Sequence, residues 1–200
     1  MYGTQKKRLP FRVSFNAPAV LGFSAACVAA QLLNLLTGGG ANRLVFSVYR
    51  SSLLDPLAYV RLVCHVLGHA DWQHLIGNLM YLLILGPMLE EKYGSRSLLI
   101  VIGTTAVVTG LVNVLFFPGI RLLGASGVVF AMILLASITT RGGDHAIPVT
   151  FILVALLYLG QQIADGLFRA DQISQMAHII GGAVGSVLGF AMNRISVGKR

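Results

Sequence analysis

The decisive stretch of this sequence is Leu123-Gly124-Ala125-Ser126-Gly127-Val128-Val129-Phe130, in which a serine stands between two glycines and a long apolar run begins. A serine in this setting has two interpretations. It is a small residue that lets two helices approach each other, or it is a nucleophile placed inside a membrane. The surrounding sequence decides between them.

Composition places the chain in a lipid bilayer. Of its 200 residues, 56% are hydrophobic and 11% are charged, and the mean hydropathy is +0.78. About a quarter of the residues of a soluble domain are charged. One core could not bury so much apolar surface, so an integral membrane protein is predicted. The net charge of +8 comes from basic residues between the apolar runs, where they set topology. The bilayer is therefore an expected partner, and nucleic acid is not.

Six apolar runs predict an all-α, polytopic membrane protein with a bundle of six transmembrane helices. Each is close to the roughly 20 residues that a helix needs to cross the hydrocarbon core. They cover about residues 18–36, 72–89, 97–117, 125–140, 146–168 and 174–193. The predicted domains are a short cytoplasmic lead over 1–17, the membrane domain over 18–193 and a basic cytoplasmic tail over 194–200. Gly86-Pro87 is expected to bend or end the second helix.

The basic residues predict the orientation. Ten Lys and Arg residues fall on the side of the amino terminus and five on the other side. Because cytoplasmic segments carry the excess of Lys and Arg, both termini are expected in the cytoplasm, with the chain in the plasma membrane. The second, fourth and sixth helices then begin at the extracytoplasmic side.

Four polar residues fall near the start of these three helices. His74 and Asn78 share one face of the second helix because they are four residues apart, Ser126 begins the fourth, and His178 lies in the first turns of the sixth. At a rise of about 1.5 Å per residue, all four lie within roughly 10 Å of the outer boundary. Polar residues inside the membrane are costly, so their shared depth predicts a functional site on the extracytoplasmic side.

The residue types suit acyl transfer. A serine needs a base to take its proton, and the imidazole of His178 is suited to that role. Histidine and asparagine side chains such as His74 and Asn78 can donate to an oxyanion, and so can the backbone N–H of Ser126, which lies at a helix start. None of the seven acidic residues lies well inside a span, so the pattern favours a Ser–His dyad over a triad.

Small residues suggest how the fourth and sixth helices meet. Gly181, Gly185 and Gly189 recur every four residues along one stripe, and such stripes allow close helix packing. We expect this stripe to face the fourth helix at Gly127 and Ala131, which would bring His178 to Ser126 and place Phe130 beside the imidazole. Gly124 is expected to leave room for a substrate backbone beside the serine.

These motifs resemble the rhomboid intramembrane serine proteases in their minimal six-span bacterial form. The resemblance rests on His74-xxx-Asn78, Gly124-Ala125-Ser126-Gly127 and Ala177-His178-xx-Gly181, which stand in the family's order on the corresponding spans. It implies that Ser126 is the nucleophile, that His178 is the general base, and that His74, Asn78 and the Ser126 amide form the oxyanion hole. The implied substrates are transmembrane proteins.

Other parts of the chain follow the family less closely. His65 and His69 match upstream histidines that look structural in the family, and Glu90-x-Lys92-x-Gly94-Ser95 resembles the turn after the second span. A tryptophan–arginine pair of the first loop is replaced by Val60-Arg61, which leaves open how that loop packs. The family's lateral gate would map to the fifth span and to residues 166–171.

Two other functions stay open at this point. A catalytically silent relative would bind transmembrane helices without cutting them, although all four site residues are present. A transporter would use the buried polar residues as a pathway, but the inner halves of the spans lack ionisable groups. No cofactor is expected, and no metal either, because no acid or cysteine joins the three histidines at 65, 69 and 74 on a span. The sequence does not give the oligomeric state.

Overall fold

The computed structural model describes residues 15–138, 149–157 and 172–197, and all regular structure in these ranges is helical. The all-α fold class is thus confirmed. The long helices are α1 (Pro18–Leu36), α4 (Trp72–Tyr93), α5 (Ser95–Phe116), α6 (Ser126–Ile138) and α8 (Gln172–Val197). Residues 149–157 form a further helical stretch. Shorter helices α2 (Gly40–Leu44), α3 (Pro56–Cys64) and η1 (His65–Leu67) occupy the connection between α1 and α4.

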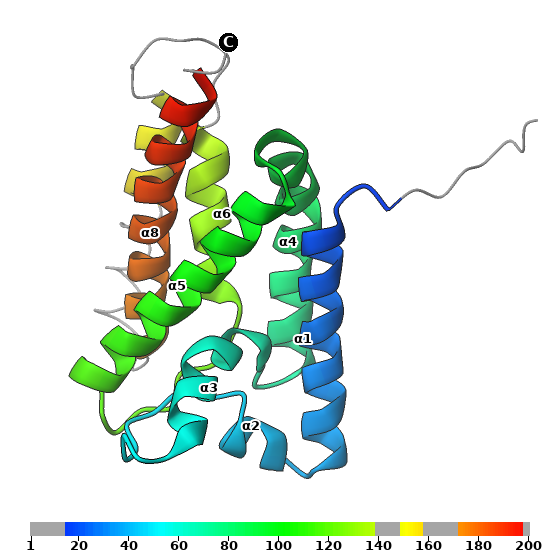
Figure 1. The fold of residues 1–200 in the computed structure, drawn as a ribbon, viewed down its shortest axis with the longest axis vertical. Helices are drawn as coiled ribbons and strands as arrows, with labels where there is room; N and C mark the ends of the chain where they lie inside the picture. Colours follow the sequence, from blue (N-terminus) through cyan, green and yellow to red (C-terminus); the bar gives the residue numbers. More distant parts are fainter. Residues whose placement is uncertain (1–14, 139–148, 158–171, 198–200) are drawn as a thin grey trace, which may run out of the picture.

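The long helices form one bundle (Figure 1). α1 packs beside α4 on one flank, α6 packs beside α8 on the other, and α5 crosses the bundle at a slant. Helix α6 is apolar all round, and most of its side chains are buried, which is the pattern of a helix at the centre of a core. α1 begins and α8 ends at the same end of the bundle, opposite α2 and α3.

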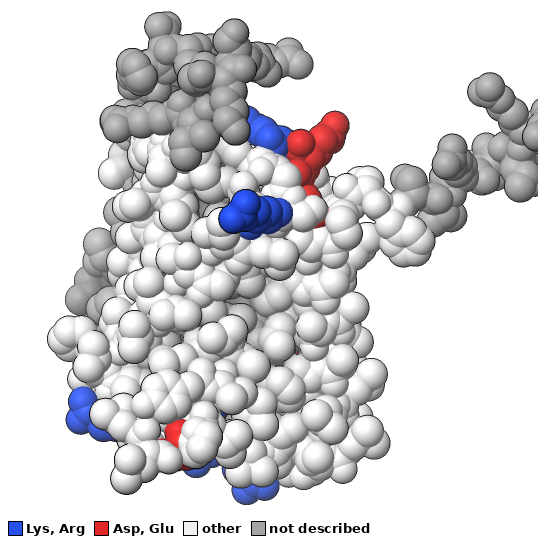
Figure 2. All heavy atoms as spheres, viewed as in Figure 1, with Lys and Arg blue, Asp and Glu red and all other residues white. Residues whose placement is uncertain are grey.

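The surface of the bundle carries many exposed apolar side chains, among them Leu32, Ile84, Leu111 and Val187. Figure 2 shows that charged residues on this face gather at the two ends, with an uncharged band between them. Among the described residues, α1 and α5 are the two helices long and apolar enough to cross a membrane by length and composition. The number of six spans stays a prediction.

Of the two alternatives expected at Gly86-Pro87, an end of the helix is wrong, because α4 continues through Pro87 to Tyr93. Ending a helix within a bilayer would leave several backbone groups without partners, and each costs several kcal/mol. The proline removes only one such bond. The helix ends instead at Gly94, whose φ of 80° favours glycine.

At the carboxyl end of the chain, α8 runs to Val197, so helix extends into the segment that was expected to be a tail. Residues 158–171 lie outside the described residues, and with them the end of the fifth span and the loop assigned to the expected gate.

Glu90 joins the starts of two helices. Its buried carboxylate accepts hydrogen bonds from the backbone N–H groups of Ala19 at 2.8 Å and Val20 at 2.9 Å, and from the hydroxyl of Ser95 at 2.6 Å. No side chain next to α1 caps its first turn. A carboxylate from α4 therefore satisfies N–H groups that every helix leaves open at its start.

Arg61 organises the first connection, where the family tryptophan is missing. It is 2% exposed and pairs with Asp55. It also donates to Ser51 Oγ at 2.9 Å and Leu44 O at 3.2 Å, and it lies 4.6 Å from the centre of the Tyr49 ring. The neighbouring Val60 is largely exposed. The loop therefore packs around the arginine of the Val60-Arg61 pair.

Candidate active site

The segment before Ser126 is held by the first connection of the chain. Val48 and Leu122 exchange backbone hydrogen bonds of 2.8 and 2.9 Å, and the N–H of Gly124 donates to the carbonyl of His65 at 3.0 Å. Helix α6 then begins at Ser126. Residues far apart in sequence thus fix the point at which the serine leaves the loop and enters the helix.

Gly124 is needed for two reasons. Its φ of +125° is one that L side chains rarely adopt, and a Cβ at this position would lie 2.8 Å from Cε1 and 3.0 Å from Nε2 of His74. The space beside Gly124 is therefore filled by the imidazole of His74. The expected room for a substrate backbone is therefore not found on this side of Gly124.

Helix α4 presents two polar side chains to Ser126. Asp71 caps this helix by accepting from the backbone N–H of His74 at 2.7 Å. The imidazole of His74 is half-buried, and Asn78 is buried one turn further on. The Nδ2 of Asn78 has no hydrogen-bond partner within the described part of the chain, so its N–H groups remain available to a ligand.

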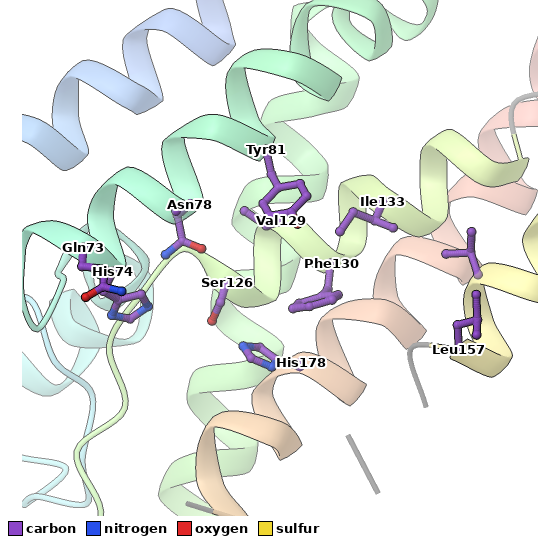
Figure 3. Close-up of a pocket in the computed structure, with 12 residues that line it drawn as sticks. Gln73, His74, Asn78, Tyr81, Ser126, Val129, Phe130, Ile133, Leu157 and His178 are labelled. Atoms are coloured by element: carbon purple, nitrogen blue, oxygen red, sulfur yellow. The ribbon is translucent and has the colours of Figure 1, made fainter. Parts of the chain in front are cut away.

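Helix α8 brings His178 to the serine. A Cβ at Gly181 would lie 2.2 Å from the carbonyl oxygen of Gly127, and one at Gly185 would lie 2.3 Å from that of Ala131. The two backbones approach this closely only because both positions on α8 lack side chains. The centroids of the Phe130 and His178 rings lie 4.5 Å apart. Figure 3 shows Ser126 between Asn78 on one side and His178 on the other.

These residues line one cavity of about 580 Å³. Its polar end holds His74, Asn78, Ser126 and His178, and its other walls are mostly apolar, with side chains from α4, from α6 and from residues 149–157 (Figure 3). An apolar pocket with a few convergent polar groups is the usual form of a ligand site.

The family model for the rhomboid domain matches residues 56–195, which is more than half of the chain and includes every site residue named above. The chain belongs to the rhomboid family. Relatives named as rhomboid proteases support intramembrane proteolysis as the activity of the family, and the family together with the apolar helices identifies a membrane protein.

Three relatives illustrate the range of the rhomboid family. The rhomboid protease GlpG of Haemophilus influenzae is 29% identical over 137 residues, covering 68% of this chain and 70% of the relative. GlpG of Yersinia pseudotuberculosis is 30% identical over 177 residues, covering 86% of this chain and 62% of the relative. Rhomboid-related protein 2 of Mus musculus is 27% identical, covering 70% of this chain and 53% of the relative. The chain spans less than two thirds of the last two proteins.

Five further positions of this rhomboid line the cavity without a signal in the sequence that would have placed them there. Gln73 and Tyr81 line the cavity together with Gly77, and the three form an i, i+4, i+8 stripe beside His74 and Asn78. Their spacing was visible, but nothing in the sequence marked that stripe as facing the cavity. Val154 and Leu157 were likewise assigned only to an apolar span.

The two histidines of the first connection, His65 and His69, are fully buried and do not line the cavity. His65 is 1% exposed, with Nε2 3.0 Å from the carbonyl of Ala106, and His69 is 0% exposed, with Nδ1 3.1 Å from that of Leu67. Across the described ranges, no three His, Cys, Asp or Glu residues are placed to hold a metal ion.

Acid should destabilise the folded chain through His65 and His69. Burial lowers the pKa of each to about 4, and for His69 the charge of a protonated His74 adds to the effect. An unfolded histidine titrates near pH 6.5. Between about pH 6.5 and 4 the unfolded chain therefore binds more protons, and the free energy of unfolding falls with the pH. We expect a loss on the order of 3 kcal/mol per histidine at pH 4, measured by thermal unfolding in detergent.

The variant His65→Gln provides the control for this prediction, because it removes one titrating group and leaves the other acidic groups of the chain in place. Its unfolding temperature should depend less steeply on pH than that of the wild type. Parallel pH profiles for the two proteins would contradict the assignment.

Proposed function

We propose that this chain is a serine endopeptidase that cleaves peptide bonds in or next to transmembrane segments of other membrane proteins. The observation that carries the proposal is the convergence of Ser126, His178, His74 and Asn78 from three helices at one end of a single cavity. Within the proposed membrane domain of residues 18–193, no cofactor takes part in the reaction.

The proposed mechanism uses the Ser126–His178 dyad. Ser126 Oγ attacks the carbonyl carbon of the substrate while His178 takes the hydroxyl proton, and the carbonyl oxygen becomes an oxyanion. The intermediate collapses, the C–N bond breaks, and His178 returns the proton to the leaving amine. An acyl-enzyme remains. Water then attacks the acyl carbon while His178 takes a proton from it, the bond from that carbon to Ser126 Oγ breaks, His178 returns the proton to Oγ, and the acid product leaves.

The oxyanion would be stabilised by His74, Asn78 and the backbone N–H of Ser126. Asn78 supports this role by its position, because it is buried, lines the cavity and has an Nδ2 group without a partner among the described residues. Donors fixed before the reaction need no reorganisation when the negative charge forms. Gly124, Gly181 and Gly185 serve the site by allowing the close approaches described above, and the backbone of Gly127 is what Gly181 lies against. Phe130 lies against the proposed base.

Replacement of Asn78 by alanine should lower kcat by about 10²- to 10³-fold, which is the usual effect of losing one oxyanion donor. The KM for the substrate should change little, because the donor acts on the transition state. Initial rates of cleavage of a model transmembrane substrate measure both parameters. Gln73→Ala changes a neighbouring amide in the cavity wall and should leave kcat within about 3-fold. Equal rates for Asn78→Ala and wild type would remove Asn78 from the oxyanion hole.

We further propose that the protein lies in the plasma membrane with both termini in the cytoplasm. The ten basic residues on the side of the termini support this orientation, and so does the position of the start of α1 and the end of α8 at one end of the bundle. The cavity would then open toward the extracytoplasmic side, from which water reaches the acyl-enzyme. The orientation can be measured by labelling cysteines introduced at residues 5 and 53 in intact cells.

Activity-based labelling tests the proposed function. Membranes holding wild type, Ser126→Ala or His178→Ala are treated with a fluorophosphonate probe, and cleavage of a model transmembrane substrate is followed in parallel. We expect labelling and cleavage with wild type alone. A wild-type protein that neither reacts nor cleaves, yet co-purifies with transmembrane helices, would instead be a silent helix-binding relative.

A further inference from the structure

We infer that His69 is a positioning residue for the reaction and that it fixes the imidazole of His74 where the oxyanion forms. This inference rests on the proposed function. The two rings lie 5.1 Å apart between centroids, with an interplanar angle of 72°. This is the edge-to-face contact that aromatic rings prefer. It joins a fully buried ring of the first connection to a half-buried ring in the wall of the cavity.

His69 is itself fixed in two ways. Because a carbonyl oxygen only accepts, Nδ1 of His69 must carry the proton that is donated to Leu67 O over 3.1 Å. The carbonyl of His69 accepts from Nδ2 of Asn42 at 2.8 Å. The ring therefore has a defined tautomer and a defined position, and it is a rigid support for its neighbour.

His74 is constrained by a second contact as well. Gly124 is so close that even a methyl group on its Cα would lie 2.8 Å from Cε1 of His74. With His69 against the ring too, the imidazole has little space in which to turn. A donor that is held in place before the reaction stabilises developing charge better than one that must reorient.

The hydrogen-bonding chemistry of His69 indicates that this side chain does more than fill space in the core. In the Nδ1–H tautomer, Nε2 is an acceptor, and it is buried with no partner in the described part of the chain. Leaving such a group unsatisfied costs about 1–3 kcal/mol. A purely structural position would be better filled by an apolar side chain. The histidine instead combines a hydrogen bond to Leu67, which orients the ring, with an edge contact to His74.

A matched pair of variants separates the ring contact from stability. His69→Phe keeps a planar ring against His74, whereas His69→Leu fills much of the space without one, and both lose the bond to Leu67. We expect similar unfolding temperatures for the two variants. Cleavage of a model transmembrane substrate should show kcat about 10- to 100-fold below wild type for His69→Leu, with an unchanged KM, and kcat close to wild type for His69→Phe.

His65→Leu is the control, because this equally buried histidine contacts α5 through the carbonyl of Ala106. It should lower the unfolding temperature and leave kcat within about 2-fold of wild type. A double-mutant cycle completes the test. If His69 acts through His74, then His69→Leu should lower kcat in the wild-type background and have no further effect in the His74→Ala background.

Three results would overturn the inference: equal kcat for the Phe and Leu variants, an equal loss of kcat in His65→Leu, or additive effects of His69→Leu and His74→Ala. None of them touches the proposed function, provided that wild type cleaves the substrate and Ser126→Ala does not. Absence of cleavage by wild type would instead remove the proposed function, and this inference with it.

Discussion

Replacement of Gly185 by alanine is expected to destabilise the folded chain by about 3 kcal/mol or more, at the upper end of the effects of overpacking. The new Cβ would lie 2.3 Å from the carbonyl oxygen of Ala131 and 2.4 Å from its Cα. Both neighbours are backbone atoms, which cannot rotate away as the end of a side chain can. Helix α8 would therefore have to move away from α6.

The same substitution should also impair catalysis, because α8 carries His178. A displacement of about 1 Å of a positioned group can lower a rate about 10²-fold. We expect kcat for a model transmembrane substrate to fall by about this factor in the fraction of protein that remains folded. Thermal unfolding in detergent and initial cleavage rates give the two quantities separately.

Gly103→Ala and Gly189→Ala calibrate this result. A Cβ at Gly103 in α5 would meet nothing within 4 Å, and alanine there should raise stability by up to about 1 kcal/mol through helix propensity. The two atoms nearest to a Cβ at Gly189 would be the ends of side chains, Cδ1 of Leu135 at 3.0 Å and Cδ1 of Ile138 at 3.1 Å, and the backbone Cα of Leu135 would lie at 3.7 Å. Its effect should fall between the other two. If Gly185→Ala were as stable and active as Gly103→Ala, the packing of α8 on α6 would be disproved.

Removal of the Glu90 carboxylate is the second large effect that we expect. Glu90→Ala should lower the free energy of unfolding by about 3–5 kcal/mol, because it deletes three hydrogen bonds to a charged group and leaves the buried N–H groups of Ala19 and Val20 without a partner. Thermal or denaturant unfolding in detergent measures the loss.

Two further variants sharpen the interpretation of Glu90. Glu90→Gln keeps one acceptor oxygen and should lie between alanine and wild type. Glu91→Ala removes the adjacent, exposed carboxylate and should change stability by less than about 0.5 kcal/mol. Equal effects at residues 90 and 91 would show that local charge, and not the bridge between α1, α4 and α5, determines the stability of this region.

Local signals in the sequence predicted the helices well where a bilayer leaves the chain few alternatives. The first apolar run predicted a helix over about residues 18–36, and the structure places α1 at Pro18–Leu36. The shared depth of His74, Asn78, Ser126 and His178 predicted that residues from three helices meet, and all four line one cavity. The reason is geometric. In a helix that crosses a membrane of known thickness, the rise per residue gives the depth of each residue from its position in the sequence.

Contacts between distant segments could not be predicted in this way. The bridge of Val48 to Leu122 and the bond from Gly124 to His65 position the serine, yet they use backbone groups that every residue carries. The capping of α1 by Glu90 likewise has no local signal. The sequence predicted that Gly124 makes room for a neighbour, but that this neighbour is the His74 ring is seen only in the structure.

The placement of His178, the proposed base, on α8 has a consequence for biosynthesis. A protease that attacks membrane segments endangers nascent proteins around it, its own unfinished chain included. About fifty residues separate Ser126 from His178, which at usual rates of translation corresponds to roughly 3–10 s during which the nucleophile exists without its base. On the proposed mechanism the enzyme is therefore silent throughout its own insertion, and α8 switches it on by docking its glycines against α6.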